Sequence, residues 1–161
     1  MIVALLGLLA AACATEPGPP PTVAEIVVRT ARDMNPNTEG EPSPVVLRVF
    51  RLADPGSFQR AAYDDLFEKD LETLGPDLIG TVDILIEPGS SETFRRTLGQ
   101  RDLWLGFVVT FHDAETAQWR ALAPVAPEAK TAILLEVGPR RITASTVEPA
   151  TAAAAPRPAG R

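Results

Sequence analysis

The sequence contains one cysteine and one histidine among its 161 residues. A single cysteine, Cys13, cannot form a disulfide within the chain, so the fold depends on its core. A chain of this length makes one domain, which buries roughly two thirds of its unfolded surface. One cysteine and one histidine are also too few ligands for a transition-metal site. We therefore expect neither a metal nor another cofactor.

Motifs for catalysis are missing as well. His112 is followed by Asp113, yet no GxSxG turn is present to supply a nucleophile. No glycine-rich loop has the spacing that cradles phosphates. We expect a protein that is not an enzyme and has no small-molecule substrate. Carboxylates that pair only in space leave no local pattern, so an enzyme of that kind stays an open alternative.

Positive charge is scarce, with 15 Lys and Arg against 21 Asp and Glu and a net charge of −6. A nucleic-acid partner is not expected, because phosphate binding needs a basic surface. The acidic residues Asp64, Asp65, Glu68 and Asp70 cluster, but they lack the alternating ligands and central glycine of a calcium loop. We interpret them as the solvated face and first turn of a helix.

The apolar run Ile2–Ala12 is too short to span a bilayer core, which takes about 20 residues. It ends in small residues, as the h-region of a secretory signal peptide does. The segment Leu9–Cys13 resembles a bacterial lipoprotein signal, which is cleaved before an acylated cysteine. The alternative is that Cys13 is an inert small residue of the leader.

Acylation of Cys13 would attach fatty chains such as palmitate, and more than one chain makes a stable anchor. The next residue, Ala14, is not the aspartate associated with inner-membrane retention. We therefore expect the protein on the periplasmic face of the outer membrane.

Proline and glycine are plentiful, with 16 and 11 residues. The prolines of Ala14–Pro21 favour an extended polyproline spacer of roughly 25 Å. The segment Glu148–Arg161 is rich in alanine and proline without apolar periodicity, so we expect disorder there. The predicted organisation is a signal peptide (1–12), an acylated cysteine with a spacer (13–22), a folded domain (23–147) and a tail (148–161).

The folded domain is dominated by apolar residues at every second position. In Val23–Ala31, Ala24, Ile26 and Val28 share one face, which indicates a half-buried strand. Val45–Leu52 is apolar on both faces except for its arginines, which predicts a central strand. Further strands are expected over Leu78–Glu87, Ser91–Leu98, Leu103–Phe111, Trp119–Val125, Lys130–Val137 and Arg141–Thr146.

The spacing of these strands predicts their pairing. Leu78–Glu87 and Ser91–Leu98 are expected to form a hairpin around Pro88-Gly89, and the last two strands another. Trp119–Val125 ends in prolines and is expected at an edge.

Ser57–Leu74 has the spacing of a helix, and Asp65 with Glu68 suggests a capping box inside it. About eight short strands with one helical insertion predict a mainly β, antiparallel sandwich.

The polar segment Ala31–Ser43 joins the first two strands. Asn35-Pro36 and Gly40 favour turns, and Pro42 and Pro44 keep the chain extended. Composition alone favours a solvated connection. A stiff loop on the lip of a sheet is also well placed to contact a partner.

Residues Asp33–Leu52, DMNPNTEGEPSPVVLRVFRL, resemble the type VI secretion lipoprotein family, TssJ or VasD. The segments Leu74–Leu78, Glu87–Gly89 and Trp104–Asp113 follow in the family's order. The resemblance covers roughly Val23–Ser145. The family more often has arginine at the position of His112, so no role carries over to that residue.

The resemblance implies a transthyretin-like sandwich and an outer-membrane lipoprotein of the secretion apparatus. In that family the loop between the first two strands binds the periplasmic C-terminal domain of TssM, within a complex of TssJ, TssL and TssM. Its prolines would stiffen the loop, and Asp33, Asn35, Asn37 and Glu39 would supply hydrogen bonds and charge. The loop carried over to this sequence comprises Arg32, Asp33, Met34, Asn35, Pro36, Asn37, Thr38, Glu39, Gly40, Glu41, Pro42 and Ser43.

A different class of protein would fit the same composition. It is a lipid-anchored periplasmic sandwich that binds a carbohydrate or a peptide through exposed tryptophans. Trp104 and Trp119 are the candidates, although tryptophans in strand patterns more often fill cores.

Overall fold

The structure, a computed structural model, describes residues 18–147. The predicted signal peptide, Cys13, most of the spacer and the predicted tail lie outside these residues. Within this range the chain forms eight strands: β1 (Thr22–Thr30), β2 (Val45–Leu52), β3 (Leu78–Ile86), β4 (Ser91–Leu98), β5 (Trp104–Val109), β6 (Arg120–Pro124), β7 (Lys130–Val137) and β8 (Ile142–Val147).

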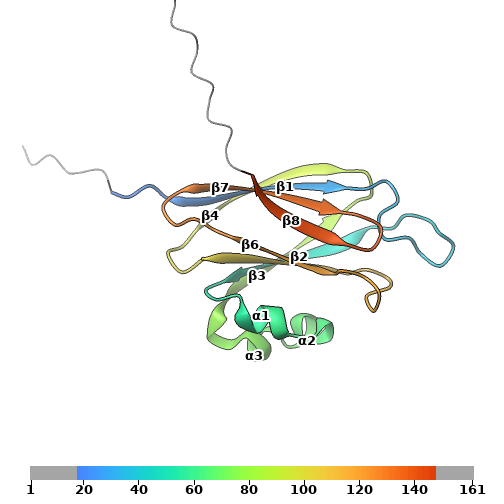
Figure 1. The fold of residues 1–161 in the computed structure, drawn as a ribbon, viewed down its shortest axis with the longest axis horizontal. Coiled ribbons are helices and arrows are strands. Elements are labelled where there is room, and N and C mark those ends of the chain that lie inside the picture. The colour runs from blue at the N-terminus through green and yellow to red at the C-terminus, as the bar shows by residue number, and fades with distance from the viewer. Residues whose placement is uncertain (1–17, 148–161) are drawn as a thin grey trace, which may run out of the picture.

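The strands form two four-stranded sheets that pack face to face (Figure 1). Sheet A has the order β4-β1-β7-β8, and sheet B has the order β3-β2-β5-β6. The predicted β-sandwich is therefore confirmed, with β2 in the interior of its sheet and β6 at an edge, as expected. One pair departs from antiparallel pairing, because β1 and β7 run in parallel.

The core between the sheets comes from the alternation seen in the sequence. Ala24 and Val28 of β1 are fully buried, and Ile26 nearly so. Leu105 and Phe107 of β5 face them from sheet B and are also buried. Burial of this many aliphatic side chains stabilises the fold without a disulfide, at about 25 cal/mol per Å² of apolar surface removed from water.

The predicted hairpin of Leu78–Glu87 and Ser91–Leu98 is wrong. β3 pairs with β2 in sheet B, whereas β4 pairs with β1 in sheet A. The turn between them carries the chain from one sheet to the other, and Gly89 there has a φ of 68° and donates its N–H to the Ala31 carbonyl (3.1 Å). Periodicity reveals which face of a strand is buried but not which strand lies beside it. The predicted hairpin of β7 and β8 is confirmed.

The helical insertion covers the outer face of sheet B (Figure 1). It is divided into α1 (Gly56–Arg60), α2 (Tyr63–Glu68), α3 (Asp70–Leu74) and the 3₁₀ turn η1 (Gly75–Asp77). The predicted capping box is wrong, because α2 starts at Tyr63 and Asp65 already lies inside it. No side-chain hydrogen bond caps α2.

A second apolar cluster holds the insertion against the sheet. Phe58, Leu66 and Leu74 from the helices pack on β2 and β5 and are almost fully buried. Gly106 of β5 makes this approach possible, because a Cβ there would lie 2.8 Å from the Phe58 ring. Trp104 also packs against this cluster, and so does Trp119. Both tryptophans are half-buried. They therefore do not form the exposed aromatic surface that the alternative of a carbohydrate- or peptide-binding sandwich requires.

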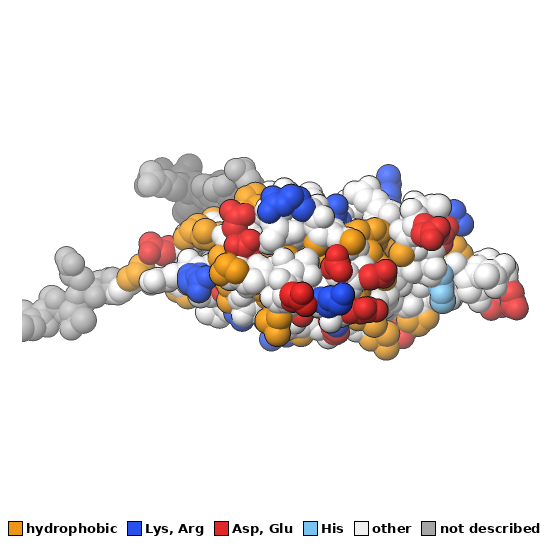
Figure 2. All heavy atoms as spheres, turned by 90° about the horizontal axis from the view of Figure 1, so that it is seen from below, with side chains coloured by type: hydrophobic (Ala, Val, Ile, Leu, Met, Phe, Trp, Pro, Cys, Tyr) orange, Lys and Arg blue, Asp and Glu red, His pale blue; other side chains and the backbone are white. Residues whose placement is uncertain are grey.

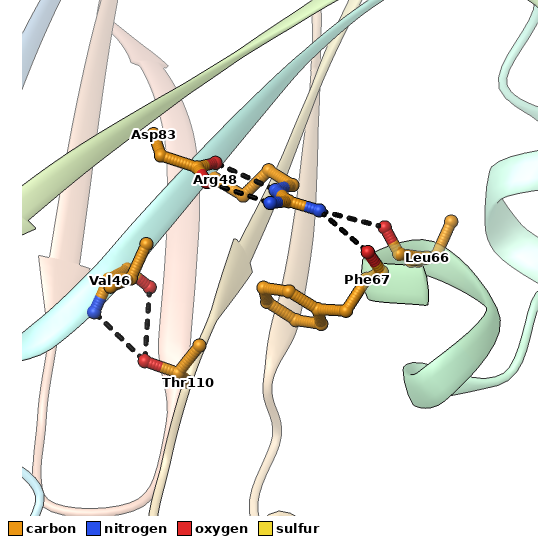
Figure 3. Close-up of polar contacts among 6 residues, drawn as sticks. All are labelled: Val46, Arg48, Leu66, Phe67, Asp83 and Thr110. Atoms are coloured by element: carbon orange, nitrogen blue, oxygen red, sulfur yellow. Dashed lines mark hydrogen bonds and ion pairs between the residues drawn. The ribbon is translucent and has the colours of Figure 1, made fainter. Parts of the chain in front are cut away.

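One arginine ties the insertion to the sheet (Figure 3). Arg48 of β2 donates two hydrogen bonds of 2.7 Å to the two carboxylate oxygens of Asp83 on β3. Its third nitrogen donates to the carbonyl of Phe67 (3.1 Å), and the guanidinium carbon lies 4.7 Å from the centre of the Phe67 ring. These bonds to Arg48 lower the pKa of Asp83. The end of α2 is thereby held to the sheet by a charge-assisted contact.

Among residues 18–147, no helix has the length and apolarity needed to cross a membrane. The same part of the chain holds no group of three or more His, Cys, Asp and Glu side chains arranged to bind a metal ion.

Candidate partner-binding loop

The loop after β1 projects from one end of the sandwich, where it appears in cyan in Figure 1. It crosses from sheet A to sheet B, because β1 and β2 belong to different sheets. The chain enters β1 at the opposite end, at Thr22. One strand therefore joins the N-terminal side of the domain to the loop.

The base of the loop is held by Asn35, which is only 3% exposed and has a φ of 47°. Its side-chain oxygen accepts a 2.7 Å hydrogen bond from the backbone N–H of His112, and its side-chain nitrogen donates to the carbonyl of Pro44 (3.3 Å). Its own backbone N–H donates to the carbonyl of Pro139 (3.2 Å). Asparagine tolerates this left-handed backbone conformation better than most residues.

Met34 adds an apolar contact to this base. Its side chain is fully buried and belongs to the core between the sheets. Its carbonyl accepts the N–H of Ser43 (3.1 Å), which brings the two arms of the loop together. The loop is thus fixed at its root by both packing and hydrogen bonds.

The tip of the loop is organised by Asn37. Its side-chain oxygen accepts two hydrogen bonds of 2.9 Å, from the backbone N–H groups of Glu39 and Glu41. Its backbone N–H donates to the Glu41 carbonyl (2.9 Å), and its carbonyl accepts the N–H of Gly40 (3.0 Å). Gly40 has a φ of 83°, a conformation that glycine adopts without strain. The tip is therefore a closed turn with a defined shape.

The surface of the loop is formed by residues whose side chains do not take part in these packing contacts and hydrogen bonds. Acidic side chains stand at the outer end of the molecule (Figure 2). The exposed loop residues are Arg32, Asp33, Thr38, Glu39, Gly40, Glu41 and Pro42. They leave two carboxylates, Glu39 and Glu41, at the tip.

Burial changes the interpretation of two predicted site residues. The sequence places Met34 and Asn35 in a partner-binding surface, but neither side chain reaches the surface. Asn35 uses both polar atoms of its side chain within the molecule, so it shapes the loop and does not supply a free hydrogen bond. The sequence shows that a residue is polar, but its burial depends on segments far away in the chain.

Two segments support the loop although no local sequence pattern predicts their contact with it. They are the backbone at His112 and at Pro139, each of which makes a hydrogen bond with Asn35. Close by, Asp113 accepts a 2.6 Å hydrogen bond from the Thr116 hydroxyl, and this bond lowers the pKa of Asp113. Neither segment has a motif that would link it to the loop.

Comparison with known proteins places most of the folded domain in one family. Residues 22–140 match the family model described as type VI secretion lipoprotein, VasD, EvfM, TssJ. A search of curated proteins finds no match.

Solved structures give the same result. The lipoprotein TssJ1 of the type VI secretion system of Pseudomonas aeruginosa has a similar structure, with a TM-score of 0.77 and 30% identity over 81% of this chain and 99% of that one. A chain of a structure described as "Type VI membrane complex" gives a TM-score of 0.67 at 26% identity, over 79% of this chain and 98% of that one. A chain of the structure described as the TssM C-terminal domain (869-1107) from EAEC shares the fold, with a TM-score of 0.62 at 24% identity over 80% and 99% of the two chains.

The family match spans nearly all residues that the structure describes, from the first strand to the turn before the last one. Members of this family are structural lipoproteins of the secretion apparatus and not enzymes. This chain belongs to the type VI secretion lipoprotein family.

Proposed function

We propose that this chain is an outer-membrane lipoprotein of the type VI secretion membrane complex, and that its loop 32–43 binds the periplasmic C-terminal domain of TssM. The observation that carries the proposal is the preformed loop at the end of the sandwich opposite the N-terminal entry. The family match supports the lipoprotein assignment, and the descriptions of two similar structures support the membrane complex and TssM. TssL would complete the assembly.

The position of the loop suits a link between two membranes. β1 has nine residues, which span about 30 Å at roughly 3.3 Å per residue. It forms a ladder on each side, with β4 and with β7, so it is interior to its sheet. With lipid on Cys13 at one end, this strand would connect the anchor to the loop through a rigid element. The extended spacer would add reach from the membrane.

The internal order of the loop favours tight binding. Its turns are already closed by the Asn35 and Asn37 side chains, so little conformational entropy is lost when a partner binds. The exposed carboxylates of Asp33, Glu39 and Glu41 would favour a basic surface on the partner and would increase the association rate.

The loop assignment is tested by exchanging its tip and keeping its root. Replacing residues 36–41 with a Gly/Ser linker retains Asn35 and Met34, so the melting temperature should change little. Affinity for the periplasmic domain of TssM, measured by biolayer interferometry, should fall at least tenfold. Unchanged affinity would refute the loop as the binding site.

A charge reversal gives a sharper version of the same test. Glu39→Lys should weaken TssM binding several-fold, since its side chain is exposed at the tip. Glu72→Lys on α3 is the matched control, because it makes the same charge change at an exposed position on the helical insertion. Equal effects of the two variants would show only a general effect of net charge.

The anchor is tested separately. Cells given a clickable fatty acid should label the wild-type protein in the outer-membrane fraction, and Cys13→Ser should lose both the label and that location. Equal labelling of the two proteins would refute acylation at Cys13. Co-purification of TssL with wild-type protein, and its loss when TssM is deleted, would test the larger complex.

A further inference from the structure

Strand β3 lies at the edge of sheet B, and one of its two sides is not paired. Within residues 18–147 it forms a ladder with β2 alone. On β2, the carbonyls of Val46 and Leu52 accept hydrogen bonds from the N–H groups of Thr110 and Leu103, on the side of β5. Because the backbone groups of a strand point to alternate sides, the odd-numbered residues of β2 form the bonds with β3.

The register of this ladder shows which groups of β3 are free. The odd-numbered residues of β2 lie opposite even-numbered residues of β3, among them Val82 and Ile84, which therefore exchange hydrogen bonds with β2. The N–H and C=O groups of Thr81, Asp83 and Leu85 point the other way, and all three residues are exposed. Among the described residues, no backbone group of a loop bonds to them. These three residues form the free edge of β3.

The other edges of the two sheets have protection that β3 lacks. Edge strands are usually kept from pairing with other chains by charge, proline, shortness or a covering segment. β4 carries two adjacent arginines, and β6 has five residues and ends at Pro124. β8 is covered at its start, where the N–H of Ile142 donates to the carbonyl of Gln118 (2.9 Å). β3 has nine residues without proline or lysine, and its one charged side chain is paired with Arg48.

Exposed apolar side chains accompany the free edge. Leu85 is 64% exposed on the outer face of the sheet, opposite Val46, and Val82 is 36% exposed on the face toward the core. Val82 also lines a cleft of about 320 Å³ between β3 and β4, together with Arg51 and Arg96. A strand added to the free edge would cover Leu85 on one face and would have space for its side chains on the other.

The free edge adjoins the loop that we assign to partner binding. Ile86 at the end of β3 lies opposite Val45, the residue with which β2 begins after the loop. The turn after β3 is bonded to the start of the loop, since the N–H of Gly89 donates to the carbonyl of Ala31 (3.1 Å). The free edge itself spans about 13 Å, at roughly 3.3 Å per residue. A partner held by the loop would therefore lie within reach of it.

We propose that the partner bound by the loop adds one extended strand to β3, through hydrogen bonds with the backbone of Thr81, Asp83 and Leu85. This inference rests on the proposed function of the loop. In such strand addition the main-chain bonds supply affinity, and the alternate side chains supply specificity. The added strand carries an apolar side chain beside Leu85 and a neutral or basic one opposite Asp83, because like charges on directly opposite residues repel.

A second copy of this chain fits the free edge less well. Antiparallel pairing of two β3 strands that engages all three free residues would place Asp83 of each copy opposite the same residue of the other. A strand of the partner is not subject to this repulsion.

Hydrogen exchange tests the added strand without any change at the edge. Amide exchange of the full chain with Cys13→Ser is followed by NMR, alone and saturated with the periplasmic domain of TssM. In the complex the N–H groups of Thr81, Asp83 and Leu85 should exchange at least tenfold more slowly, because each would donate to the added strand. Unchanged exchange at these three residues in the saturated complex would refute the proposal.

A proline at the free edge supplies a second measurement. Leu85→Pro removes an N–H that does not take part in the ladder with β2, so the domain should remain folded by circular dichroism. Its affinity for the periplasmic domain of TssM, measured by biolayer interferometry, should fall at least tenfold, because the edge loses a donor and the proline ring obstructs an incoming strand.

Thr93→Pro on β4 is the matched control. Thr93 lies opposite Val27 of β1, and Val23 of the same strand donates its N–H to the carbonyl of Ala129, on the side of β7. By the same alternation the N–H of Thr93 points away from β1, so it belongs to the unpaired side of the other edge strand. This variant should bind TssM as the wild type does, and its amide in the unchanged chain should exchange at the same rate with and without the partner.

Failure of this inference can be distinguished from failure of the loop assignment. If Leu85→Pro binds like the wild type while exchange of residues 36–41 abolishes binding, the added strand is refuted and the loop stands. A wild-type chain that does not bind TssM would overturn both. Dimers of the chain alone in analytical ultracentrifugation that Leu85→Pro abolishes would assign the free edge to a second copy, and would equally contradict the proposal.

Discussion

Asn35→Ala removes the side chain that fixes the root of the loop. The N–H of His112 and the carbonyl of Pro44 would each lose a partner in a partly buried site. A buried polar group left unpaired costs about 1–3 kcal/mol. The φ of 47° adds about 1–2 kcal/mol, because alanine lacks the local hydrogen bonds that let asparagine adopt this conformation. Counting only the shorter bond, from the N–H of His112, together with the backbone term, the free energy of unfolding should fall by about 2–5 kcal/mol.

Thermal unfolding followed by circular dichroism measures this loss. For a domain of this size each kcal/mol lowers Tm by about 4 °C, so Asn35→Ala should melt roughly 10 °C or more below the wild type. Asn35→Gly is the matched control, because glycine accepts the positive φ and removes only the hydrogen bonds. It should melt at a temperature between those of the wild type and Asn35→Ala. Its free energy of unfolding should be about 1–2 kcal/mol higher than that of the alanine variant.

Binding is the second measurement on the same variants. If the loop binds TssM as proposed, both variants should bind it more weakly at temperatures where they remain folded, because the loop would lose its shape. An Asn35→Ala protein that melts within about 2 °C of the wild type would refute the reasoning. In that case the root of the loop would depend on Met34 and not on the asparagine.

Two further predictions concern the helical insertion. Gly106→Val adds a side chain whose Cβ would lie 2.8 Å from the Phe58 ring, so the free energy of unfolding measured in urea should fall by about 1–3 kcal/mol; an unchanged midpoint would show that the insertion can shift freely. Hydrogen bonds from Arg48 lower the pKa of Asp83 below its unfolded value, so this pair stabilises the fold above the unfolded pKa, and the contribution is lost as pH falls through the lower folded pKa. Asp83→Asn should therefore reduce the loss of stability between pH 5 and pH 2 in urea titrations, and parallel curves for both proteins would contradict this role.

Much of the local structure was predictable from the residues alone. Apolar alternation identified β1 within one residue, because a half-buried strand needs one apolar face, and the apolar run of Val45–Leu52 identified β2. The segment Asp33–Leu52 resembled the family to which the chain belongs. The turn residues Asn35 and Gly40 were recognisable because both tolerate positive φ. These features depend on the residue itself and its near neighbours.

Strand pairing was not predictable in the same way. β3 and β4 are neighbours in the sequence, yet each pairs with a strand of a different sheet. The parallel pair of β1 and β7 joins segments about a hundred residues apart. Which edges meet depends on the total apolar area buried in the final fold, and no short window of sequence contains that information.

The sequence by itself determined the strand pattern, the helical insertion, the position of the loop and the family. Tertiary structure decided what individual polar residues do. Asn35 became a buried support because Pro139 and the backbone of His112 close over it. Arg51 and Arg96 came to share a cleft because β2 and β4 fold into facing sheets. A polar side chain has the same chemistry whether it is buried or exposed. Only the distant segments that pack around it determine whether it contacts water or another part of the chain.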